Sequence, residues 1–148
     1  METLKEMLIR HEGWKTRPYR DTNGFLTIGC GHNISANGLP EFMLRYLKEN
    51  GKITNEMINE LLEKDIKIAR DACLILYPMF NSFSENRKNA LIDFLFNVGL
   101  GGAKKFKNTN KYINMGFWAQ AAKNLKKSLW HRQVKKRGTE IVNLISKG

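Results

Sequence analysis

The sequence is poor in cysteine, histidine and proline, and these shortages exclude several classes of protein. Its two cysteines, Cys30 and Cys73, lie far apart without CxxC spacing, so neither a zinc site nor a disulfide framework is expected. The three histidines are scattered, and the His11-Glu12 pair lacks the second histidine of a metalloprotease helix. With three prolines and 42% hydrophobic residues, a disordered chain is excluded. We expect a folded protein with no metal and no cofactor.

Long hydrophobic runs are also absent. No stretch approaches the roughly 18 apolar residues of a membrane span, and residues 1–10 lack the apolar core and cleavage site of a signal peptide. We therefore expect neither a membrane span nor an export signal. The length of 148 residues fits one domain. We expect a single catalytic domain, 1–148, with a small hairpin lobe at about 13–55 and a larger helical lobe in the rest.

Acidic residues are scarce relative to basic ones. The chain has 14 Asp and Glu against 25 Lys and Arg, giving a formal net charge of +11 that should attract polyanions. The basic residues gather at 104–107, 123–127 and 135–137, mostly at spacings that fit exposed helix faces. Two interpretations stay equally open, a solvated helix surface and a working polyanion-binding surface.

The hydrophobic pattern indicates a mainly helical α+β protein. Leu4, Met7 and Leu8 predict a helix to about Glu12 that Gly13 ends in the left-handed conformation. The segment 17–28 predicts a hairpin around residues 22–24, and the glycines that follow predict another tight turn.

Four helices are expected after residue 52. Thr54 should cap a long helix that ends before Pro78, and Ser84 should cap a buried central helix that the glycines from Gly99 onward stop. Amphipathic helices are expected around 117–125 and 134–145. The hairpin lobe and the helical lobe should leave a cleft between them.

Glu12 is the first candidate for chemistry. It follows Leu8 by four residues, beside the apolar stripe at the carboxyl end of the first helix. Partial burial and the negative end of the helix dipole both oppose ionisation, which suits a general acid. An ordinary solvated glutamate at a helix end remains the alternative.

Asp21 and Thr27 are the second and third candidates. A three-residue loop, 22–24, would pair Asp21 with Phe25 and Tyr19 with Thr27, so that Asp21 and Thr27 share a face. A two-residue loop, 23–24, would shift the register and send Thr27 to the opposite face. Ordinary turn chemistry is the alternative for Asp21, since aspartate often starts turns.

These candidates lie in the run RHEGWKTRPYRDTNGFLTIGCGH, Arg10–His32, which resembles the lysozyme (endolysin) family of T-even and related bacteriophages, glycoside hydrolase family 24. The resemblance continues through FNVG at 96–99, Phe106, SLWHRQ at 128–133 and Arg137, and covers nearly the whole chain. It implies a lysozyme-like fold, a muramidase activity on peptidoglycan glycan strands, and catalytic roles for Glu12 as acid and for Asp21 and Thr27 around a water.

The same resemblance implies further site residues. Gly31, Asn97, Phe106 and Arg137 would contact the sugar, with Arg137 approaching Glu12. His32 would pair with Asp65 in a structural contact, because a buried acid needs a partner. Cys30 departs from the bulkier family residue, and the segment 33–52 is short and divergent.

The mechanism expected from these roles is inverting, with Glu12 protonating the glycosidic oxygen while Asp21 and Thr27 hold a water. The family implies a monomer in the host bacterial cytoplasm that reaches the cell wall after holin-type release, with no nucleic-acid partner. The alternatives are a lytic transglycosylase or chitinase-like activity and a non-enzymatic basic module binding polyanions or membranes.

Overall fold

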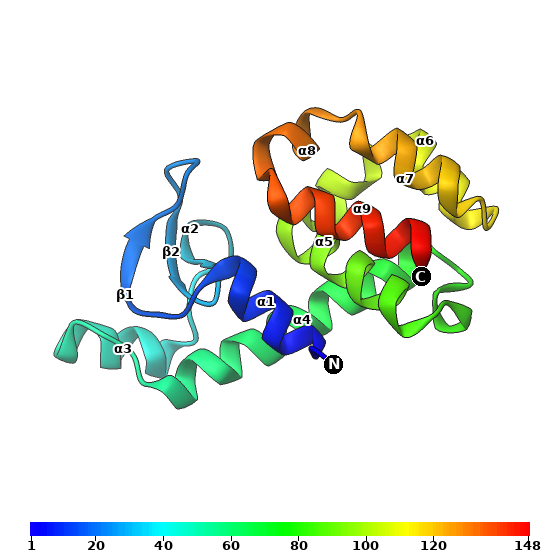
Figure 1. Ribbon diagram of the computed structural model, residues 1–148. Helices are drawn as coiled ribbons and strands as arrows, with labels where there is room; N and C mark the ends of the chain where they lie inside the picture. The colour runs from blue at the N-terminus through cyan, green and yellow to red at the C-terminus, as the bar shows by residue number, and fades with distance from the viewer. The chain divides into compact units, whose positions relative to one another are not determined.

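The computed structural model describes residues 1–148, which divide into two units, Met1–Asp65 and Ile66–Gly148 (Figure 1). Helix α4 (Asn55–Leu76) contributes its first half to one unit and its second half to the other. None of the helices combines the length and the apolarity that a membrane-spanning segment needs. The fold is the expected mixture of many helices and one small antiparallel sheet, so the α+β prediction is confirmed.

Helix α1 (Leu4–Glu12) opens the first unit and ends where the sequence predicted. Thr3 and Glu6 form a capping box at its start, each side chain bonding to the backbone of the other residue. Gly13 follows the helix with φ 85° and ψ −176°, so its φ is positive but its conformation is not the predicted left-handed helical one. The chain thus leaves α1 in an extended direction and enters the sheet.

The sheet has three antiparallel strands in the order β1-β2-β3: β1 (Lys15–Arg20), β2 (Leu26–Gly29) and β3 (His32–Asn33). Pro18 lies in β1, which is an edge strand and tolerates the missing N–H, and the pairing register shifts between Lys15 and Tyr19. The short strand β3 stands where the sequence predicted only a tight turn. Thr27 and Ile28 pair with Asn33 and His32 across that turn, which makes β3 a strand of two residues. Two residues are too few to show the alternating hydrophobic pattern by which a strand is predicted.

The sequence did not predict α2 (Ile34–Asn37) and α3 (Glu41–Asn50). Helix α2 is a single turn whose start is capped by the Asn33 side chain. Helix α3 buries only Met43, whereas Phe42 is 52% exposed, so its apolar residues do not trace one buried face. The segment does carry a hydrophobic pattern of helical period, so a helix could have been predicted here.

Helix α4 agrees with its prediction at both ends. The Thr54 hydroxyl accepts a hydrogen bond from the Met57 N–H at 3.1 Å, which caps the start, and the helix ends before Pro78. Ile58 of α4 lies against β2, because a Cβ built on Gly29 would come within 3.1 Å of the Ile58 Cγ2. Contacts of this kind hold the sheet on the first half of α4.

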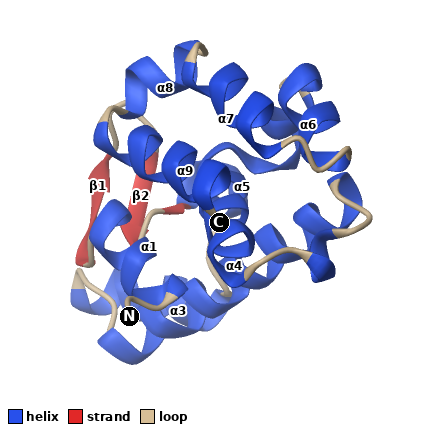
Figure 2. Ribbon diagram, turned by 45° about the vertical axis from the view of Figure 1, so that its right-hand side comes forward, coloured by secondary structure: helices blue, strands red, loops and turns tan.

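The second unit is helical throughout (Figure 2). Helix α5 (Glu85–Lys104) is capped by Ser84 and breaks at Gly99, where φ is 73° and ψ is 168°, so a further helical stretch follows the predicted stop. Apolar residues on all sides of α5 are buried, as predicted for the central helix. The remaining elements are η1 (Phe80–Ser82), α6 (Lys107–Asn114), α7 (Trp118–Lys126), α8 (Leu129–Val134) and α9 (Lys136–Lys147).

The end of the chain differs from its prediction. The helix expected around 134–145 is two helices, because Lys135 adopts a positive φ of 55° between α8 and α9. Helix α9 packs on α5, α7 and α8, and α6 packs on α7. Helix α6 was not predicted, since its segment is mostly polar. The buried residues of α9 are those with helical spacing, Gly138, Ile141, Val142 and Ile145.

A buried ion pair joins the sheet to α4 inside the first unit. The His32 Nδ1 lies 2.7 Å from the Asp65 Oδ2, and the His32 Nε2 lies 2.7 Å from the Gly38 carbonyl oxygen. A carbonyl oxygen only accepts, so Nε2 donates to it, and the doubly protonated ring satisfies both partners. His32 is only 6% exposed. Burial acts to lower the pKa of His32, but the hydrogen bonds to Asp65 and Gly38 and the charge of Asp65 outweigh it and raise the pKa above 6.5.

The raised pKa of His32 predicts a loss of stability as pH rises. The imidazolium contributes its full stabilisation below the unfolded-state pKa of about 6.5, and this stabilisation is lost as pH rises through the folded-state pKa. Each tenfold gain in proton affinity on folding corresponds to about 1.4 kcal/mol of stability. We expect urea denaturation to show this decline in the wild type and not in His32→Gln. A His32 titration midpoint at or below 6.5, followed by NMR of its ring, would contradict the ion pair.

Candidate active site

Glu12 is the last residue of α1 and lies directly against Gly31. It is partly buried. A Cβ built on Gly31 would lie 2.7 Å from the Glu12 Cδ and 2.9 Å from its Oε1. Gly31 also has a φ of 66°, a conformation that glycine adopts freely and other residues rarely adopt. The absence of a side chain at residue 31 therefore makes room for the Glu12 carboxyl group.

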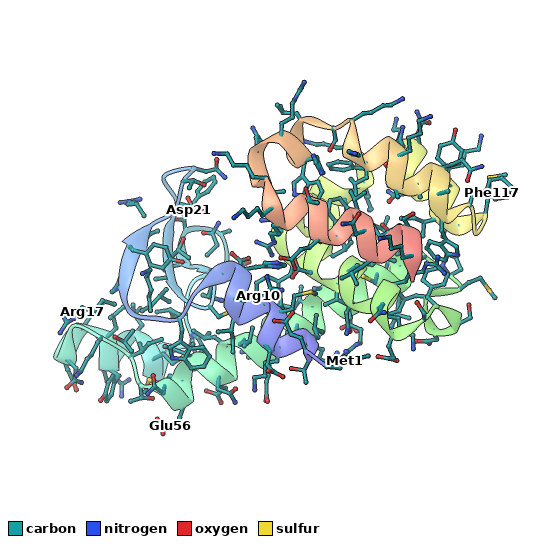
Figure 3. The ribbon with its side chains drawn as sticks, viewed as in Figure 1. Met1, Arg10, Arg17, Asp21, Glu56 and Phe117 are labelled. Atoms are coloured by element: carbon teal, nitrogen blue, oxygen red, sulfur yellow. The ribbon has the colours of Figure 1, made fainter.

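Asp21 begins the turn between β1 and β2 (Figure 3). Its backbone N–H donates to the Phe25 carbonyl oxygen at 3.0 Å, and the Gly24 N–H donates to the Asp21 carbonyl oxygen at 2.9 Å. Gly24 has the positive φ of 83° that a three-residue hairpin loop requires. The Asp21 Oδ1 also accepts hydrogen bonds from the N–H groups of Asn23 and Phe25, both at 2.9 Å. The turn thus fixes the carboxylate of Asp21 as well as the register of the strands.

Thr27 lies opposite Tyr19 in the β1–β2 pair. This is the register of the three-residue loop, so the two-residue alternative is wrong. Because side chains two residues apart on a strand share a face, Thr27 lies on the face of Tyr19 and Asp21. Its side chain is 3% exposed, and its hydroxyl donates to the Phe25 carbonyl oxygen at 2.9 Å.

Phe25 links the two polar side chains through its backbone. Its N–H donates to the Asp21 Oδ1, and its carbonyl oxygen accepts from the Thr27 hydroxyl. The aromatic ring itself is 48% exposed. One residue of the turn therefore orients both the Asp21 carboxylate and the Thr27 hydroxyl. The Thr27 oxygen keeps its lone pairs as acceptors for a third group.

Tyr19 is a member of this site that sequence reasoning missed. Burial raises the pKa of Tyr19 above 10, and the negative charge of Glu12 raises it further. Cys30 and Asp21 act in the same direction. The phenol therefore stays protonated near neutral pH and lies within electrostatic reach of both carboxylates. Strand alternation from Asp21 could have identified it, because Tyr19 is two residues earlier on the same strand.

Cys30 and His32 flank Gly31 and are both buried. Cys30 is 2% exposed and sits between two glycines of positive φ, Gly29 at 68° and Gly31 at 66°. His32 bonds to Asp65 and to the Gly38 carbonyl oxygen as described above. These contacts hold the segment that faces Glu12. No group of three or more histidine, cysteine or acidic side chains in the structure could hold a metal ion.

The other candidates, Asn97, Phe106 and Arg137, belong to the second unit. Asn97 lies on α5 itself, and Phe106 and Arg137 contact the neighbouring α5 residues Phe94 and Asp93. The Asn97 Oδ1 accepts from the Trp130 Nε1 at 2.7 Å, and the rings of both Trp130 and Phe106 pack edge-on against Phe94, with centroids 4.9 and 5.1 Å away.

Arg137 is held by a buried acid of the same unit. Its Nε donates to the Asp93 Oδ1 at 2.8 Å, and Asp93 is fully buried at 0% exposure. A buried carboxylate without a partner would be costly, so this ion pair fixes Arg137 beside α5. Sequence reasoning named Arg137 but not Asp93, because a single acid inside an apolar helix gives no pattern that indicates its partner.

The chain matches the family model for phage lysozyme over residues 9–146. It is 32% identical to Probable T4-type lysozyme 2 of Dictyostelium discoideum over 163 aligned residues, covering 100% of this chain and 96% of that relative.

Two phage proteins are also similar. The pre-baseplate central spike protein Gp5 of Enterobacteria phage T4 is 31% identical over 160 residues, which cover 99% of this chain and 28% of Gp5. The endolysin of Salmonella phage P22 is 32% identical over 94 residues, covering 62% of this chain and 58% of the endolysin. With a family match from residue 9 to residue 146, this chain belongs to the phage lysozyme family.

Proposed function

We propose that this chain is a muramidase, a glycoside hydrolase that cleaves the β-1,4 bond between N-acetylmuramic acid and N-acetylglucosamine in peptidoglycan. The observation that carries the proposal is the pairing of Asp21 and Thr27 through the backbone of Phe25, in the same unit that holds Glu12 against Gly31. Membership of the phage lysozyme family supports the same class of reaction. The two units then serve one catalytic domain.

Glu12 is the proposed general acid. It ends α1, where the negative end of the helix dipole disfavours a carboxylate, and it is partly buried. Both conditions favour a carboxyl group that carries a proton. In the reaction this proton passes to the glycosidic oxygen as the bond from that oxygen to the anomeric carbon breaks.

Asp21 and Thr27 are proposed to hold the attacking water. Because the Thr27 hydroxyl proton is directed to the Phe25 carbonyl, the Thr27 oxygen can accept one proton of a water. The Asp21 carboxylate accepts the other proton as general base while the water oxygen bonds to the anomeric carbon. The bond forms on the face opposite the leaving group, so the configuration is inverted, and Asp21 then returns its proton to solvent.

Sugar contacts are proposed for Gly31, Asn97, Phe106 and Arg137. Gly31 borders the acid without a side chain that would block a sugar ring. The location of the other three at one stretch of α5 supports a shared role, since Asn97 belongs to that stretch, Phe106 packs on Phe94 and Arg137 is fixed by Asp93. These residues would add binding energy and place the scissile bond.

A role in opening bacterial cell walls follows from this activity. The similarity to an endolysin of Salmonella phage P22 supports lysis of a bacterial host for phage release, with access to the wall through a holin-type pore. The formal charge of +11 favours contact with the acidic groups of the wall. Such attraction should weaken as ionic strength rises.

Glu12→Gln should abolish lysis because the amide cannot donate the proton that the leaving oxygen needs. We expect a loss of about a hundredfold to ten-thousandfold in the rate of clearing of outer-membrane-permeabilised Gram-negative cells. Released sugars with reducing muramic ends should disappear in parallel. Detection of anhydro-muramic ends from the wild type would instead indicate a lytic transglycosylase.

Glu49→Gln is the matched control for this experiment. Glu49 is an exposed acid on α3 in the same unit, so its replacement changes the net charge equally and leaves the site intact. Equal lysis by wild type, Glu12→Gln and Glu49→Gln would overturn the proposal and favour a non-enzymatic action of the basic surface.

Gly31→Ala should lower activity strongly, whereas its loss of stability should be no larger than that of the same change at another glycine of positive φ. The new Cβ would meet the carboxyl end of Glu12 at 2.7 Å, and this flexible side chain would move away from its position. We expect a drop of about a hundredfold in wall hydrolysis, the typical cost of displacing a catalytic group by about 1 Å. The measurements are the hydrolysis rate and the free energy of unfolding in urea.

Gly38→Ala separates this effect from backbone strain. Gly38 has the same φ of 66° as Gly31, but a Cβ there would meet no atom within 4 Å. Both variants should lose stability, on the order of 1–3 kcal/mol, because a residue other than glycine is strained at a positive φ. If Gly31→Ala keeps as much activity as Gly38→Ala, the contact between Gly31 and Glu12 does not matter for catalysis.

A further inference from the structure

A polar hollow lies in the second unit, away from Glu12, Asp21 and Thr27 in the sequence. It has a volume of about 340 Å³ and is formed by the segment that enters α6 and by the segment that links α7 to α8. Figure 3 labels Phe117, which stands just before the start of α7, whereas the hollow lies at the other end of that helix. The hollow uses residues of this unit alone, so it is complete without the first unit.

Three lysines from two separate segments line this hollow, namely Lys105, Lys107 and Lys127. No acidic residue is part of the lining, which otherwise consists of amide and hydroxyl side chains such as those of Asn108 and Asn124 and of Phe106, the residue also proposed to contact the sugar. Like charges that share a concave surface repel one another unless an anion joins them. The lining therefore has the electrostatic character of an anion site.

Like most lysines of the chain, these three have no ion-pair partner, so their ammonium groups are not already neutralised by a carboxylate. Lys5, Lys67 and Lys88 each lie within 3.4 Å of a carboxylate oxygen. No such pair involves Lys105, Lys107 or Lys127, and all three are exposed. The sequence showed only that lysines gather at 104–107 and 123–127, whereas the structure brings members of both groups to one hollow.

Hydrogen-bond donors accompany these charges. Helix α6 begins at Lys107 without a side-chain cap, and no acidic residue lies in its first turn. Its first-turn N–H groups, from residues that also line the hollow, add donors to the three ammonium groups. The Ser128 hydroxyl adds no donor, because it donates to the Leu125 carbonyl oxygen and accepts from the His131 N–H.

We propose that this hollow binds a phosphate monoester group. Lysine ammonium groups bind phosphate as point charges, and a phosphate monoester brings close to two negative charges and three acceptor oxygens. A carboxylate brings one charge and two oxygens, which matches three lysines less well. The site goes beyond the proposed hydrolysis, because it would hold the protein at a phosphate-bearing surface whether or not Glu12 acts.

Titration with inorganic phosphate tests this site directly. We expect saturable shifts in the amide NMR spectrum of the wild type at Lys107, Asn108 and Asn124, at constant ionic strength. Glu12→Gln should bind phosphate as the wild type does, so failure of the proposed hydrolysis would not affect this result. Saturable shifts at other positions only, or no saturable shifts, would overturn the proposal.

The variant K105Q/K107Q/K127Q removes the charges of the hollow, and K111Q/K126Q/K147Q is its matched control. Each lowers the formal net charge by three, and the control lysines are exposed and lie outside the lining. We expect the first variant to bind phosphate at least about fivefold more weakly and the control to change by less than about twofold. An equal loss in both variants would show non-specific attraction and overturn the site.

Acetate at the same ionic strength distinguishes phosphate from carboxylate. We expect acetate to bind the wild type at least about fivefold more weakly than phosphate, because it carries half the charge. Equal affinities would overturn the assignment of the hollow to phosphate.

Discussion

The register of the β1–β2 hairpin is the constraint on which the rest of the site depends. Side chains alternate between the two faces of a strand, so a shift of one residue would send Thr27 away from Asp21. The three-residue turn prevents this shift, because Gly24 takes a positive φ and the Asp21 carboxylate binds two N–H groups of its own turn. The residue that starts the turn is thus the residue proposed as the base. Folding of the turn and placement of the base are one event.

A second constraint places the acid beside this hairpin. Gly29 and Gly31 let the chain reverse after β2, and the missing side chain of Gly31 admits the Glu12 carboxyl group. His32 then fixes the reversal to α4 through Asp65. A helix end and a hairpin turn, both within residues 1–65, therefore supply the catalytic candidates, and the His32–Asp65 ion pair holds the segment that faces Glu12.

The sequence predicted the elements whose local signals are strong. Thr54 and Ser84 were identified as helix caps because the capping residue precedes a periodic apolar segment, and both cap helices in the structure. Helix α3 was missed although its segment carries a hydrophobic pattern of helical period, and two of its large apolar residues, Phe42 and Leu44, are exposed. The break between α8 and α9 was missed because positive φ at a lysine has no sequence signal.

The part of the candidate site that depends on the β1–β2 turn could be predicted from the sequence. Two registers were possible from the sequence and differed in the place of one glycine, Gly24, and the structure has the register that joins Asp21 to Thr27. Tyr19 was not identified from the sequence, because its role depends on the charges of Glu12 at the end of α1 and of Asp21 in the turn together. Asp93 was not identified either, because its partner Arg137 lies far along the chain. Pairings of this kind arise from tertiary packing and leave no local pattern.

The central claim is that a water held by Asp21 and Thr27 attacks the anomeric carbon, and the stereochemistry of the first product tests it most directly. Cleavage of a short oligosaccharide of alternating N-acetylglucosamine and N-acetylmuramic acid can be followed by proton NMR before the new reducing end equilibrates. The account predicts that the α-anomer appears first, because a single displacement inverts the β-linkage. Appearance of the β-anomer first would contradict it, because retention requires a covalent intermediate that the proposed roles of Asp21 and Thr27 do not provide.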